Sequence, residues 1–89
     1  MTKMEQRVLA TVEAWLALTE PFTKEDMKQA ALASGFNELQ ADLSVTQAFQ
    51  QECIDGEYLD YRVKIKPEIR ARWVSRSYTL SLPEGWGAD

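Results

Sequence analysis

The side chains that most often carry out catalysis or bind metal are scarce in this chain of 89 residues, which has no histidine and a single cysteine, Cys53. The absence of histidine excludes the Ser-His and Cys-His pairs that activate a nucleophile, and it removes the most common metal ligand. Cys53 falls on an apolar stripe of four-residue spacing and is interpreted as a small buried hydrophobe. The acidic residues Asp55, Glu57 and Asp60 lack the spacing of a calcium loop. We therefore expect a protein that is not an enzyme and has no metal site, cofactor or small-molecule substrate.

Charge is distributed unevenly along the chain. Residues 1–61 hold eleven acidic and four basic side chains, whereas residues 62–76 hold one acidic and six basic side chains. The six cations are Arg62, Lys64, Lys66, Arg70, Arg72 and Arg76. They are candidates for contacts with the phosphates of duplex DNA. Two other interpretations stay open: a solvated strand face that protects a sheet edge, or a docking patch for an acidic protein.

Glutamines and carboxylates in the middle of the chain favour two different partners. Gln47, Gln50 and Gln51 are candidate base readers, because glutamine can make a bidentate pair with adenine. Residues 37–61 contain no lysine or arginine, and the whole chain has a net charge of −4 and a pI near 4.8. Such acidity is unusual for a nucleic-acid binder and favours a basic protein partner. The candidate residues for that second surface are Glu38, Asp42, Glu52 and Asp55.

Two helices are expected in the first part of the chain. Apolar residues at helical spacing predict a helix over residues 3–18, with Trp15 as a core anchor, and Pro21 stops it. Thr23 and Asp26 form a capping-box pattern that starts a second helix, and Gly35 ends it.

The segment 36–55 leaves one alternative open. Asn37 either caps a single turn that carries Leu39 and Leu43, or lies in a loop that presents these two leucines to the core. Ser44 and the glutamine three residues later form a second capping-box pattern. It predicts a third helix over residues 44–55, which Gly56 terminates.

A two-residue period follows the glycine. Tyr61, Val63 and Ile65 alternate with basic residues, as in a strand with one buried face. A return strand is predicted over residues 73–82, with residues 67–71 as the hairpin connection. The chain is then one domain over residues 1–82 with a tail over 83–89, in which Trp86 is expected to pin the tail to the body.

Three helices followed by a hairpin resemble a winged helix-turn-helix domain, and the runs SVTQAF (44–49) and GEYL (56–59) resemble its recognition helix and the start of its wing. The fold class expected from this resemblance is α+β, a three-helix unit followed by a β-hairpin wing over residues 64–73. The resemblance implies a small regulatory module, because winged-helix proteins mostly bind DNA and a minority bind proteins. Our first hypothesis is DNA contact through the basic hairpin and the glutamine face, with a homodimer as one option. The alternative is an acidic protein-interaction module, such as an adaptor or a small inhibitor of the kind that phages encode.

Hydropathy and the first residues of the chain indicate where in the cell the protein is expected. Apolar runs are interrupted well before the ~20 residues that a membrane-spanning helix needs, so no contact with a membrane is expected. The first residues, MTKMEQR, do not look like a secretory signal, and we expect a cytoplasmic protein.

Overall fold

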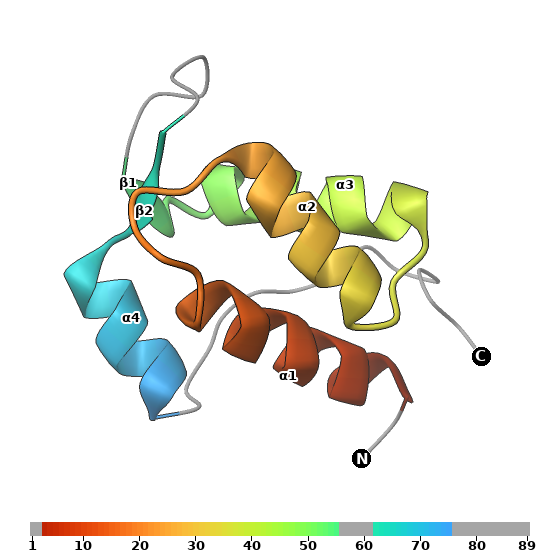
Figure 1. The fold of residues 1–89 in the computed structure, drawn as a ribbon. Coiled ribbons are helices and arrows are strands. Elements are labelled where there is room, and N and C mark those ends of the chain that lie inside the picture. Colours follow the sequence, from red (N-terminus) through yellow and green to blue (C-terminus); the bar gives the residue numbers. More distant parts are fainter. Residues whose placement is uncertain (1–2, 56–61, 76–89) are drawn as a thin grey trace.

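The computed structural model of the chain describes residues 3–55 and 62–75, which are mostly helical (Figure 1). Their elements are, in chain order, α1 Lys3–Leu16, α2 Lys24–Ala33, α3 Glu38–Gln50, β1 Ile54–Asp55, β2 Lys64–Ile65 and α4 Pro67–Val74. Helix α2 packs against both α1 and α3, and α4 packs against α1. None of the described helices is both long enough and apolar enough to cross a membrane.

Trp15 is the core anchor that the sequence predicted for the first helix. It is completely buried, and its indole N–H donates to the backbone oxygen of Met27 on α2 at 2.8 Å. A buried indole needs such an acceptor because its N–H has lost contact with water. The Trp15 ring also lies 6.0 Å from the ring of Trp73 on α4. One side chain thus joins α1 to two other helices.

The predicted boundaries of the second helix are confirmed at both ends. The backbone N–H of Asp26 donates to Oγ1 of Thr23, and the N–H of Thr23 donates to the carboxylate of Asp26, each at 3.0 Å. This reciprocal capping box satisfies backbone donors that have no partner within the helix. At the other end Gly35 has φ +109°, and the N–H of Phe36 donates to the oxygen of Ala31. A left-handed residue of this kind ends a helix and favours glycine.

Helix α3 begins six residues before the predicted start. Asn37 is its N-cap: the N–H of Gln40 donates to the Asn37 side chain at 2.8 Å, and the Asn37 N–H donates to the Gln40 side chain at 3.0 Å. The prediction that Ser44 caps the helix is wrong. Ser44 is buried in mid-helix, where its hydroxyl donates to the backbone oxygen of Gln40. That bond within the helix lets a serine sit in the interior without an unmet polar group.

The predicted end of this helix, at residues 55–56, is also wrong. Helix α3 ends at Gln50, and Glu52 adopts the left-handed region with φ 57°. The N–H of Cys53 then donates to the oxygen of Ala48. Cys53 and Ile54 are buried, but Cys53 immediately precedes β1 and Ile54 is its first residue, so neither belongs to a last helical turn. Burial alone does not distinguish the two, which is why helical spacing extended the prediction too far.

The two-residue alternation around β2 is confirmed. Val63 and Ile65 are buried, whereas Arg62 and Lys64 are exposed. Strand β2 pairs antiparallel with β1, with Ile54 opposite Ile65. Val63 also exchanges two backbone hydrogen bonds with Phe22, of 2.7 and 2.9 Å. The strand partner of β2 therefore precedes it in the sequence.

The predicted hairpin connection and the start of the return strand lie in a helix, α4. Pro67 occupies its first turn, where a missing N–H costs nothing. Ile69 and Trp73, four residues apart, are 7% and 2% exposed and bury one face of the helix. The wing expected over residues 64–73 is wrong, because residues 67–74 form a helix, which places the ring of Trp73 against that of Trp15. Tyr61, Gly56, residues 76–82 and the tail with Trp86 lie outside the described residues.

Candidate interaction surfaces

The three candidate base readers do not form one exposed surface. Gln50, at the end of α3, is exposed. Gln47 and Gln51 are only partly exposed, and the side-chain oxygen of each is buried. A bidentate contact with adenine uses both the oxygen and the nitrogen of a glutamine side chain. The arrangement therefore gives little support to base reading by Gln47 and Gln51.

The candidate phosphate contacts fall on β2 and α4. Arg62, Lys64 and Arg72 are exposed and Lys66 is half-buried. Figure 1 shows β2 and α4 on one side of the molecule, next to the end of α3 that leads into β1. Arg76 lies outside the described residues.

Arg70 has a structural role instead. Its guanidinium donates to the backbone oxygen of Leu16 at 3.1 Å and to the carboxylate of Glu20. These bonds connect α4 to the end of α1 and to the segment that follows it. Because Arg70 is paired within the molecule, it is a weaker candidate for a phosphate contact than its neighbours.

The thiol of Cys53 lies near two of these cations without being accessible. Cys53 is 1% exposed, and burial raises the pKa of its thiol, while the charges of Arg72 and Lys66 act in the opposite direction. A buried, protonated thiol is unreactive. Cys53 is the small buried hydrophobe that its apolar stripe predicted.

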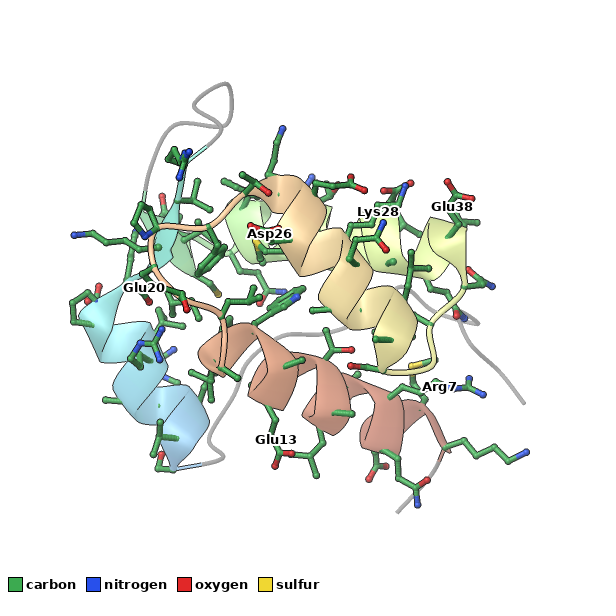
Figure 2. All side chains as sticks on the ribbon, viewed as in Figure 1. Arg7, Glu13, Glu20, Asp26, Lys28 and Glu38 are labelled. Carbon is green, nitrogen blue, oxygen red and sulfur yellow. The ribbon has the colours of Figure 1, made fainter. Side chains whose placement is uncertain are left out.

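The four candidate acidic residues divide into separate groups. Glu38 and Asp42 are one turn apart on α3, and a carboxylate oxygen of each lies 3.2 Å from Nζ of Lys28 on α2. Hydrogen bonds to these two carboxylates raise the pKa of Lys28. Figure 2 shows Lys28 and Glu38 side by side. Glu52 lies beyond the other end of α3, about 20 Å away along a helix axis, and for Asp55 only the backbone, opposite Lys64 in the ladder, is described.

A stripe of α3 in which Leu39 and Gln50 are exposed and Leu43 and Thr46 are half-buried was missed by the sequence analysis. Leu39, Leu43, Thr46 and Gln50 follow one another at spacings of four, three and four residues, which places them on one face of the helix. We call these four residues the α3 stripe. Leu39 is 65% exposed, so the alternative that buried both leucines is wrong. The signal in the sequence was the pattern of Asn37 and Gln40, which starts the helix early enough to include Leu39.

The α3 stripe borders a polar groove between α2 and α3. The groove has a volume of about 260 Å³ and is lined by Lys24, Glu25, Lys28, Asp42, Val45 and Thr46. The hydroxyl of Thr46 donates to the backbone oxygen of Asp42, so Thr46 adds no unmet polar group to the stripe. Charged side chains dominate the groove, and the apolar contact area of this surface is on the stripe.

The described part of the chain contains no group of three or more histidine, cysteine, aspartate or glutamate side chains that could hold a metal ion. No protein-family model matches the chain, and comparisons with curated proteins and with solved structures found no match.

Proposed function

We propose that this chain is a non-enzymatic protein-interaction module that docks a partner through the α3 stripe. The observation that carries the proposal is the 65% exposure of Leu39, with Leu43 one turn further along the same face. Most of the Leu39 side chain is in contact with water, and apolar area inside a polar rim is typical of a docking site.

The charges beside the α3 stripe specify the chemistry of the partner. Glu38 and Asp42 border it and share the single cation of Lys28, which leaves one carboxylate in excess. A complementary partner presents apolar side chains flanked by lysine or arginine. The same carboxylates repel phosphates, so α3 is poorly suited to enter a groove of DNA.

A photo-crosslinking side chain at position 39 tests the proposal in cells that produce the protein. We expect a specific adduct from position 39 and none from position 6, since Gln6 is an exposed residue of α1 away from the stripe. The change Asp42→Lys should reduce the adduct severalfold by reversing a charge at the rim, without unfolding an exposed position. Equal adducts from positions 39 and 6 would refute the proposal.

The exposed cations of β2 and α4 favour a second candidate, contact with the phosphates of duplex DNA. Arg62, Lys64 and Arg72 are exposed, and Lys66 precedes α4. Such contacts position a protein on DNA without reading its sequence. On this view the module acts in the cytoplasm, where a lone thiol such as Cys53 stays reduced.

Binding to a duplex measured at several salt concentrations tests this candidate. In the triple variant R62A/K64A/K66A, affinity at low salt should fall strongly, and the slope of log K against log salt should decrease by about one for each cation lost. The control Lys3→Ala removes one exposed cation from α1 and should leave both quantities almost unchanged. A wild-type chain that does not bind DNA at low salt would exclude the candidate.

A further inference from the structure

We draw no further inference here: the strongest candidate, the polar groove between α2 and α3 beside the α3 stripe, carries none, because the charged groups of Glu25, Lys28 and Asp42 that line it are already bonded within the molecule and nothing in the structure shows what ligand would occupy it.

Discussion

Arg70 shows how a charged residue that a linear reading assigns to a binding surface can serve the fold instead. Its guanidinium is hydrogen-bonded to the backbone oxygen of Leu16, 54 residues away in the sequence, and to the carboxylate of Glu20, 50 residues away. Arg72, two residues further on, is exposed on the same helix. The two arginines look alike in the sequence, and only their surroundings separate them.

This difference predicts unequal effects on stability. Arg70→Ala should lower the free energy of unfolding by about 1 kcal/mol, which is the value of a charged hydrogen bond reduced for a side chain that is one third exposed. Arg72→Ala, the matched control, should change it by less than about 0.5 kcal/mol. Urea unfolding followed by circular dichroism measures both. Equal losses would contradict the structural role of Arg70.

At the scale of the elements, the start of α3 decides which residues are presented to a partner. Two capping boxes compete in the sequence, one at Asn37 and one at Ser44, and the structure uses the first. The extra six residues bring Glu38, Leu39 and Asp42 into the helix. Without them the α3 stripe would lose its most exposed apolar side chain and both flanking carboxylates.

The choice of cap can be tested directly. Asn37→Ala should lower the free energy of unfolding by about 1 kcal/mol, because the backbone N–H of Gln40 loses its side-chain acceptor. Ser44→Ala should cost much less, since it removes a single hydroxyl bond within the helix and alanine favours helix. Thermal melts of both variants provide the comparison. A larger loss of stability in Ser44→Ala than in Asn37→Ala would contradict the cap at Asn37 and indicate that the helix begins at Ser44.

At the scale of the whole molecule, opposite charges are separated in space as they are in sequence. The carboxylates of Glu38 and Asp42 flank α3, and the cations lie on β2 and α4. Docking of a basic partner on the α3 stripe and contact with DNA are both weakened by salt, because both neutralise charge. They differ in the residues involved: Arg62 and Lys64 matter for DNA, and Leu39 and Asp42 matter for the protein partner.

Features governed by close neighbours in the chain were predictable. The apolar stripe with Trp15, the box of Thr23 and Asp26, and the glycine end of α2 were each confirmed. So was the burial of Val63 and Ile65 between exposed basic residues. In each case the signal lies within about one helical turn or one strand, so it does not depend on the rest of the fold.

By itself, the sequence determined the first two helices, the face of β2 that is buried, and a chain without the histidine on which most catalytic sites depend. The tertiary structure decided where α3 begins and ends, that residues 67–74 form a helix, and which side chains of α3 and α4 remain exposed. The physical reason is that these segments fit two local patterns equally well. Contacts between distant residues, above all Trp15 with Trp73 and Arg70 with Leu16, select one pattern over the other.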